Sequence, residues 1–217
     1  ETFLELIREL DKIEGIERYR ISSIEPNLIT EETVDFCAAS KKFLPHFHIP
    51  LQAGSNKILH LMKRKYDREL FAERVNYINS RMPHAFIAAD VIVGFPHETA
   101  EDFAEAKAFI ASLPLAALHV FTYSERPGTP AAGMPESVPM NERHRRSMEL
   151  QELSGRKKEA FYRANKGLWE ADNEDGMMYG FTENYIRVGR KFDERYINEI
   201  TEETIEIIDH EHKSYIV

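Results

Sequence analysis

The sequence predicts an α/β fold, in which a parallel sheet alternates with helices and a small all-β module follows. Two observations lead to this prediction. Up to about residue 166, short apolar segments alternate with segments of helical spacing, which is the pattern of right-handed β–α–β units. Beyond that residue the alternation stops, and only short strand-like segments remain.

Local signals set the ends of the predicted elements. The predicted helices are residues 3–10, 30–43, 55–63, 67–81, 99–112 and 141–165, and the predicted strands are residues 18–24, 46–51, 86–93 and 116–123. Thr30, Ser55, Asp67 and Thr99 stand where N-cap residues belong, and Asp102 completes a capping box with Thr99. Four strands are too few to close a barrel of eight, so the sheet is open in this chain.

The boundary between the two parts is predicted at Lys166-Gly167, because lysine before glycine is a helix stop signal. This gives domains of residues 1–166 and 167–217, the second with predicted strands at 176–188, 196–200, 205–208 and 215–217. Residues 168–217 contain 5 Lys/Arg and 13 Asp/Glu, so 5 − 13 = −8 of the chain's net charge of −9 lies there.

Composition excludes several classes of protein. The chain has 217 residues, of which 42% are hydrophobic and 30% charged, so it is globular rather than disordered. No stretch approaches the roughly 18 apolar residues of a membrane helix. The net charge of −9 disfavours a strongly basic nucleic-acid binder, although not a local basic groove. The chain begins at Glu1 without a signal peptide, so we expect a piece of a longer cytoplasmic protein.

Cysteine content is equally restrictive, because Cys37 is the one cysteine. A single thiol excludes an internal disulfide framework, a zinc site built on several thiolates and an iron–sulfur cluster held by this chain's own thiolates. Phe36 and Ala38 flank it in a predicted helix, which favours a buried apolar role.

Functional groups in α/β folds gather just past the carboxyl ends of the strands. Four polar turns stand at such positions: residues 22–26, 50–56, 94–99 and 123–129. Each has an alternative explanation, since strand-to-helix turns need Gly, Pro, Ser and Asn for backbone reasons alone. Four together favour a binding rim, where Gly94 lets a ligand approach the backbone and Glu25, Gln52 and Glu98 bind an amine or ribose hydroxyls.

His46 and His48 are two residues apart on a predicted strand, so both rings point to one face. Metal-dependent barrel hydrolases use such pairs, and further ligands would be needed. The favoured alternative is that His46 is exposed at the start of the strand and His48 lines the interior of the sheet.

Longer strings around the four turns form a distinctive set. They are RISSIEP (residues 20–26), HIPLQAGSN (48–56), DVIVGFPHET (90–99) and HVFTYSERPGTPAA (119–132), and MKRKY (62–66) accompanies them. Together they resemble the radical S-adenosylmethionine (radical SAM) methylthiotransferase family over about residues 18–166. The chain departs from that family at Ala53 and His97, where serine and glycine are usual. It also lacks the cluster-binding C-x3-C-x2-C motif and the upstream methylthiotransferase domain.

The resemblance implies a partial (β/α) barrel, the C-terminal part of a radical SAM core, that binds S-adenosylmethionine (SAM) beside a [4Fe-4S] cluster. It implies that residues of this chain form part of the SAM wall: Glu25, His48, Gln52, Gly94 and Glu98. No residue is identified as a catalytic acid or base. Because the cluster ligands are absent, we expect this chain alone to be inactive.

Residues 180–188, GFTENYIRV, resemble the branch of the family that modifies N6-threonylcarbamoyladenosine of the tRNA anticodon loop by replacing the C2 hydrogen with a methylthio group. Residues 167–217 would then be a TRAM domain, a small β-barrel that binds RNA. The candidate RNA-binding residues are Arg126, Tyr185, Arg187, Arg190 and Lys191. The net charge of −8 stands against this contact, because RNA binding usually needs a positive face.

Three hypotheses are open at this point: a tRNA-modifying radical SAM enzyme, a metal-dependent hydrolase that uses His46 and His48, and a non-catalytic RNA-binding module. The resemblance also implies that the strand at 18–24 has lost a neighbour. An unpaired strand edge and the bared inner face, with Ile21, His48, Phe121 and either Ile92 or Val93, favour self-association.

Overall fold

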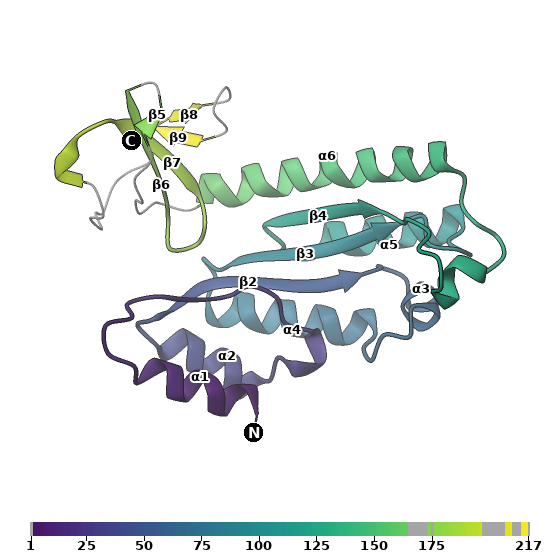
Figure 1. Cartoon of the computed structure of the whole chain (residues 1–217), viewed down its shortest axis with the longest axis horizontal. Coiled ribbons are helices and arrows are strands. Elements are labelled where there is room, and N and C mark those ends of the chain that lie inside the picture. Colours follow the sequence, from purple (N-terminus) through teal and green to yellow (C-terminus); the bar gives the residue numbers. More distant parts are fainter. Residues whose placement is uncertain (1, 165–172, 175, 197–206, 210–213, 217) are drawn as a thin grey trace.

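The computed structural model describes residues 2–164, 173–174, 176–196, 207–209 and 214–216. No helix among these residues is long and apolar enough to cross a membrane. The described chain forms a parallel α/β sheet and a second, mostly antiparallel sheet at the far end of a long helix (Figure 1).

The first sheet has the strand order β1-β2-β3-β4, and all its pairs are parallel. Its strands are β1 (Tyr19–Ile21), β2 (Phe43–Gln52), β3 (Phe86–Val93) and β4 (Ala117–Thr122). Its helices are α1 (Phe3–Asp11), α2 (Glu31–Ala39), α3 (Asn56–Leu61), α4 (Arg68–Arg81), α5 (Ala100–Ser112) and α6 (Met140–Ala164), with short 3-10 turns at Pro26–Leu28 and Pro130–Gly133. The predicted parallel α/β fold is therefore confirmed.

The two faces of this sheet differ because side chains alternate along a strand. On one face, Phe47, Ile49 and Val91 join the main core with side chains from the helices, including Phe71 of α4. α6 lies along β4 and adds Leu150 to the same core (Figure 1). The opposite, inner face has less cover, and Phe121 is 53% exposed there.

Most predicted elements have the bounds that the sequence signals gave. Asp67 and Thr99 cap α4 and α5 through their side chains, and Asp102 completes the capping box. Ser55 is the N-cap residue of α3, but its side chain makes no capping hydrogen bond; its hydroxyl donates to Asp102 Oδ1 at 3.3 Å. The helix predicted at 30–43 ends at Ala39, since Ser40 is extended and begins the turn into β2.

The second sheet has the strand order β5-β6-β7-β9-β8. Its strands are β5 (Asn173–Glu174), β6 (Met177–Phe181), β7 (Arg187–Lys191), β8 (Ile207–Asp209) and β9 (Ser214–Ile216). The single strand predicted at 176–188 is wrong, because the chain turns back between β6 and β7. Thr182 holds this turn: its hydroxyl donates to Asn184 Oδ1 at 2.6 Å and accepts from the Ile186 N–H at 2.7 Å.

The β6–β7 turn packs against the amino-terminal end of the first sheet. Asn184 Nδ2 donates to the His84 carbonyl at 3.0 Å, and Ile186 shares a small core with Phe86 of β3 and Tyr162 of α6. The predicted domain boundary at Lys166-Gly167 and most of the strand predicted at 196–200 lie outside the described residues.

Candidate functional site

The carboxyl ends of β2, β3 and β4 line a cavity of about 480 Å³. Its lining residues are Gln52, Asp90, Ile92, Phe121, Thr122, Tyr123, Ser124, Arg126, Thr129 and Ala131. Gln52 ends β2 in a left-handed conformation, with φ of +66°, which turns the chain out of the sheet. Because ligands of open α/β sheets bind at this edge, the cavity is the candidate cofactor site.

Gly94, at the end of β3, is held by a buried carboxylate. Its N–H donates to Glu98 Oε2 at 2.6 Å, and Arg146 Nη1 of α6 lies 2.6 Å from the same oxygen. Both charged side chains are about 5% exposed. Burial raises the pKa of Glu98 in spite of the opposing effects of Arg146 and the Gly94 N–H. Glu98 therefore fixes the turn after β3 from within the protein.

Arg143, one turn earlier on α6, fixes the neighbouring turn after β4. Its Nη1 donates to the Tyr123 carbonyl at 2.7 Å, its Nε donates to the Val138 carbonyl at 2.7 Å, and its guanidinium pairs with Glu125. This pairing lowers the pKa of Glu125 to about 2. A Cβ atom at Gly94 would lie 2.3 Å from Arg143 Cγ, so only glycine fits beside this side chain.

Three polar side chains meet on the inner face of the sheet. Asp90 Oδ1 of β3 lies 2.6 Å from His48 Nε2 of β2 and 3.2 Å from His119 Nδ1 of β4. Their ligand-type atoms lie within 4.8 Å of one another, as a metal site would require. Tetrahedral zinc at 2.0–2.1 Å from each ligand, however, keeps ligand atoms roughly 3.3 Å apart. The 2.6 Å contact is instead the length of a hydrogen bond.

The predicted cofactor residues take different positions. Gln52 lines the carboxyl-end cavity, and His48 belongs to the histidine–aspartate cluster on the inner face. Gly94 and Glu98 form the buried turn after β3, and Glu25 lies 3.3 Å from Arg64 Nη1 with 41% of its side chain exposed. All belong to the turns after β1, β2 and β3 or to the inner face. Their contact with SAM remains a prediction.

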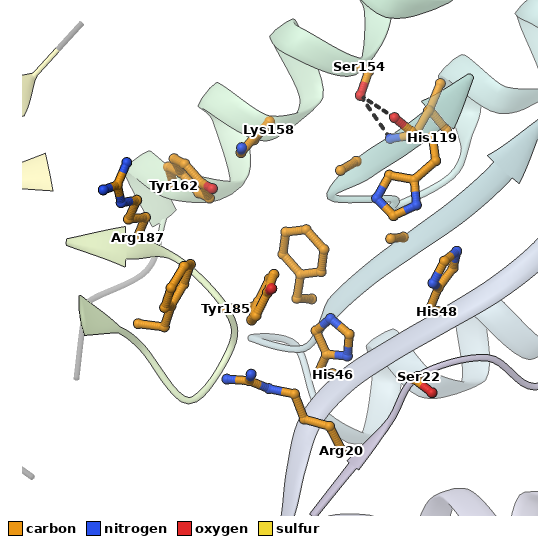
Figure 2. Close-up of a pocket in the computed structure, with 15 residues that line it drawn as sticks. Arg20, Ser22, His46, His48, His119, Ser154, Lys158, Tyr162, Tyr185 and Arg187 are labelled. Carbon is orange, nitrogen blue, oxygen red and sulfur yellow. Dashed lines mark hydrogen bonds between the residues drawn. The ribbon is translucent and has the colours of Figure 1, made fainter. Parts of the chain in front are cut away.

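A second cavity, of about 570 Å³, lies at the amino-terminal end of the sheet, beneath the β6–β7 turn (Figure 2). It is lined by Arg20, Ser22, His46, His48, Phe86, Ala88, Ala117, Leu118, His119, Ser154, Lys158, Tyr162, Phe181, Tyr185 and Arg187. His48 and His119 thus line this cavity, while Asp90, which both contact, lines the carboxyl-end cavity.

His46 is buried, which corrects the expectation of an exposed ring at the start of the strand. Its ring stacks on Phe86 with centroids 5.5 Å apart, and Tyr185 meets its edge at 5.1 Å. Burial lowers the pKa of His46 to about 4, and the nearby charge of Arg20 adds to the effect. His46 and His48 share a face as predicted, but Asp90 contacts only His48 of the two.

The predicted RNA-binding residues do not form one surface. Arg126 lines the carboxyl-end cavity, whereas Tyr185 and Arg187 line the amino-end cavity. The guanidinium carbon of Arg190 lies 3.7 Å from the centroid of the Tyr196 ring, and Lys191 is exposed at the end of β7. RNA binding by this set remains a prediction.

Sequence reasoning missed several residues that the structure places in these sites. Asp90 and His119 are paired neighbours on β3 and β4, and both point to the inner face. The alternation of side chains along a strand could have indicated this, because the predicted ends of both strands are correct to within one residue. Arg20 and Arg146 had no comparable signal. Their partners, Tyr185 and Glu98, are distant in sequence.

Many known proteins are similar to this chain, and three of them illustrate the similarity. Threonylcarbamoyladenosine tRNA methylthiotransferase MtaB of Bacillus subtilis is 41% identical over 208 residues, which is 91% of this chain and 46% of that protein. tRNA-2-methylthio-N(6)-dimethylallyladenosine synthase of Pelotomaculum thermopropionicum is 38% identical over 82% of this chain and 41% of that protein. Among solved structures, the radical SAM enzyme coproporphyrinogen III oxidase of Escherichia coli aligns with a TM-score of 0.48 and 21% identity over 74% of this chain and 35% of that one.

The chain spans less than half the length of these two curated relatives. The model of the Radical SAM superfamily matches residues 1–110, which is half of the chain and extends from α1 into α5. The matched segment includes the first three polar turns, and the resemblance to methylthiotransferases is confirmed. The chain belongs to the radical SAM superfamily.

Proposed function

We propose that this chain works in a tRNA methylthiotransferase that replaces the C2 hydrogen of N6-threonylcarbamoyladenosine, in the anticodon loop, with a methylthio group. The observation that carries the proposal is the 41% identity to the Bacillus subtilis relative over 91% of the chain. That alignment is long enough to include both the parallel sheet and the β6–β7 hairpin. SAM, when bound, supplies the radical chemistry, and the protein supplies position and exclusion of water.

The carboxyl-end cavity is the proposed place of SAM in this chain. It combines apolar walls, from Ile92 and Phe121, with polar groups from Gln52 and Ser124, as ligand sites usually do. Arg143 holds the turn after β4, which supplies Tyr123 and Ser124 to the lining. The [4Fe-4S] cluster does not fit this chain, because Cys37 is the one thiol and burial raises its pKa to about 12.

A chimaera tests the proposed function. This chain would replace the matching part of the Bacillus subtilis relative in cells that lack that protein, and tRNA nucleosides would be measured by mass spectrometry. We expect 2-methylthio-N6-threonylcarbamoyladenosine. Gln52→Ala should lower its level about tenfold, because one ligand hydrogen bond contributes roughly 1–1.5 kcal/mol. Gln151→Ala, on exposed α6 surface, is the matched control.

The chain expressed alone is the second control. We expect colourless protein after anaerobic treatment with iron and sulfide, and no cleavage of SAM. Methylthiolation of dimethylallyladenosine instead of threonylcarbamoyladenosine by the chimaera would contradict the proposed branch. Unmodified tRNA with a stable, cluster-loaded chimaera would contradict the function itself.

The metal-dependent hydrolase is the less favoured candidate. His46, one of the two histidines on which it depended, stacks on Phe86 and meets the edge of Tyr185, and it is not part of the His48–Asp90–His119 cluster. The non-catalytic RNA-binding module does not account for a match to the Radical SAM superfamily model over half of the chain.

We propose that the chain by itself associates through the inner face of the sheet. Phe121 is 53% exposed on this face, and His48 and Ile92 are half-buried, whereas Ile21 and Val93 are buried. β1 is an edge strand of three residues and offers little backbone for pairing, so we assign the contact to the apolar face. Light scattering should give a mass that rises with concentration and falls toward the monomer in Phe121→Ser. A constant monomeric mass would contradict this.

A further inference from the structure

The histidine–aspartate cluster consists of His48, Asp90 and His119, which come from β2, β3 and β4. Asp90 and His119 are paired neighbours across β3 and β4. The rings of His48 and His119 meet edge to face on the inner side of the sheet, with centroids 4.7 Å apart (Figure 2). The side chain of His119 is 49% exposed, so the cluster is open to a ligand on that side.

Asp90 determines which nitrogen of each ring carries a hydrogen. Its Oδ1 lies 2.6 Å from His48 Nε2 and 3.2 Å from His119 Nδ1, and a carboxylate can only accept hydrogen bonds. Both of these nitrogens therefore donate, and the other nitrogen of each neutral ring is an acceptor. The two acceptors, His48 Nδ1 and His119 Nε2, make no hydrogen bond within the described part of the chain. They suit a ligand that carries N–H or O–H groups.

The cluster lies between the two cavities of the sheet. His48 and His119 line the amino-end cavity, and Asp90 lines the carboxyl-end cavity together with Ile92 and Phe121. Ile92 and Phe121 are also paired neighbours, two residues beyond Asp90 and His119 on the same strands, so they lie on the same face. A ligand in the carboxyl-end cavity can therefore extend along this face to the cluster.

We propose that His119 Nε2, together with His48 Nδ1, accepts hydrogen bonds from the N6 substituent of the target adenosine, and that Asp90 holds the two rings in position. This inference rests on the proposed function. In adenine, C2 and N6 lie on either side of N1. When C2 faces the proposed SAM cavity, the N6 substituent can extend along the inner face toward the cluster.

The chemistry of the substituent gives this contact a role in specificity. A threonylcarbamoyl group carries urea N–H groups and a hydroxyl, all of which can donate. The dimethylallyl group, which appears in the name of the Pelotomaculum thermopropionicum relative, adds only hydrocarbon to the N6–H. A site with fixed hydrogen-bonding groups rejects an analogue that leaves those groups unpaired. The cluster therefore favours threonylcarbamoyladenosine over dimethylallyladenosine.

Equilibrium dialysis of this chain against free nucleosides tests the inference. We expect N6-threonylcarbamoyladenosine to bind about tenfold more tightly than N6-dimethylallyladenosine, because one or two hydrogen bonds are gained. His119→Leu should abolish this preference. His119→Gln should keep most of it, because its amide oxygen can also accept. His144→Leu is the matched control, since His144 is exposed on α6 and contributes to neither cavity.

Asp90→Asn tests the positioning of the rings. An amide can donate as well as accept, so it no longer fixes the hydrogens, and we expect a preference between those of the unaltered chain and His119→Leu. Thermal melting should show that each variant is folded. An unaltered chain without the preference, or a preference that survives in His119→Leu, would overturn the inference. Zinc binding in calorimetry that His119→Leu abolishes would also overturn it, since the cluster would then be a metal site.

The inference and the proposed function fail separately. A methylthiolating chimaera, together with nucleoside binding that does not depend on His119, would refute the contact and leave the function. A preference that depends on His119, together with a folded, cluster-loaded chimaera that leaves tRNA unmodified, would refute the function and leave the contact.

Discussion

Arg146→Leu is expected to lower the free energy of unfolding by about 3–5 kcal/mol at pH 8, because it leaves the Glu98 carboxylate buried without its cation. Arg146 is 4% exposed and Glu98 is 6% exposed, so water cannot replace the lost partner. The Gly94 N–H, at 2.6 Å, is the remaining hydrogen bond to that carboxylate. Urea unfolding followed by circular dichroism measures the change.

Arg145→Leu is the matched control for this prediction. Arg145 precedes Arg146 on α6 and pairs with Glu142 and Glu149, but its side chain is 53% exposed. Exposed ion pairs contribute roughly 0–1 kcal/mol, so we expect a correspondingly small change. The double variant Glu98→Gln/Arg146→Leu should recover part of the loss, because no charge is then buried. Equal effects of Arg145→Leu and Arg146→Leu would contradict the assignment.

The effect of Arg146→Leu should also depend on pH. Burial already raises the pKa of Glu98 in the folded protein, and removing Arg146 removes an influence that lowers it. A carboxyl group whose pKa is higher in the folded state is fully stabilising below its unfolded pKa, and that stability is lost as pH rises through the folded pKa. The difference between Arg146→Leu and the unaltered protein should therefore be largest near pH 8 and shrink as the pH falls toward 4.5.

Gly94→Ala is expected to destabilise the protein by about 2–5 kcal/mol, from two causes. A left-handed backbone costs an L-residue roughly 1–2 kcal/mol, and Gly94 has φ of +77°. The new Cβ would also lie 2.3 Å from Arg143 Cγ, and overpacking typically costs about 1–3 kcal/mol. Arg143 cannot move away freely, because its guanidinium holds the Tyr123 carbonyl.

Gly128→Ala separates these two causes. Gly128 has φ of +82°, and a Cβ there would meet nothing within 4 Å. It should therefore show the backbone cost alone, about 1–2 kcal/mol. Thermal or urea unfolding of both variants gives the cost of the clash as the difference between them. A difference of zero would mean that Arg143 yields to the new methyl group, and the close packing of α6 on the turn after β3 would be refuted.

Some residues of the candidate sites could be predicted from the sequence, and others are brought together only by the tertiary structure. Gln52, Gly94 and Glu98 could be named from the sequence because they lie in recognisable turns, and a turn residue is fixed by its immediate neighbours. The histidine–aspartate cluster could not be named, because it joins β2, β3 and β4 across strand registers that no local pattern specifies. The buried state of His46 depends on Tyr185, which comes from the second sheet.

The sequence by itself determined the parallel α/β order, the bounds of β3 and α5, and the family resemblance. These depend on the periodicity of apolar residues, on N-cap residues and on the sequence motifs of the turns, which are all local properties. Tertiary structure alone decided which polar groups are buried and with what partner. Glu98 and Arg146 lie 48 residues apart, and Arg20 meets Tyr185 only where the β6–β7 turn reaches the sheet. Desolvation and ion pairing depend on neighbours in space, and a single sequence does not contain that information.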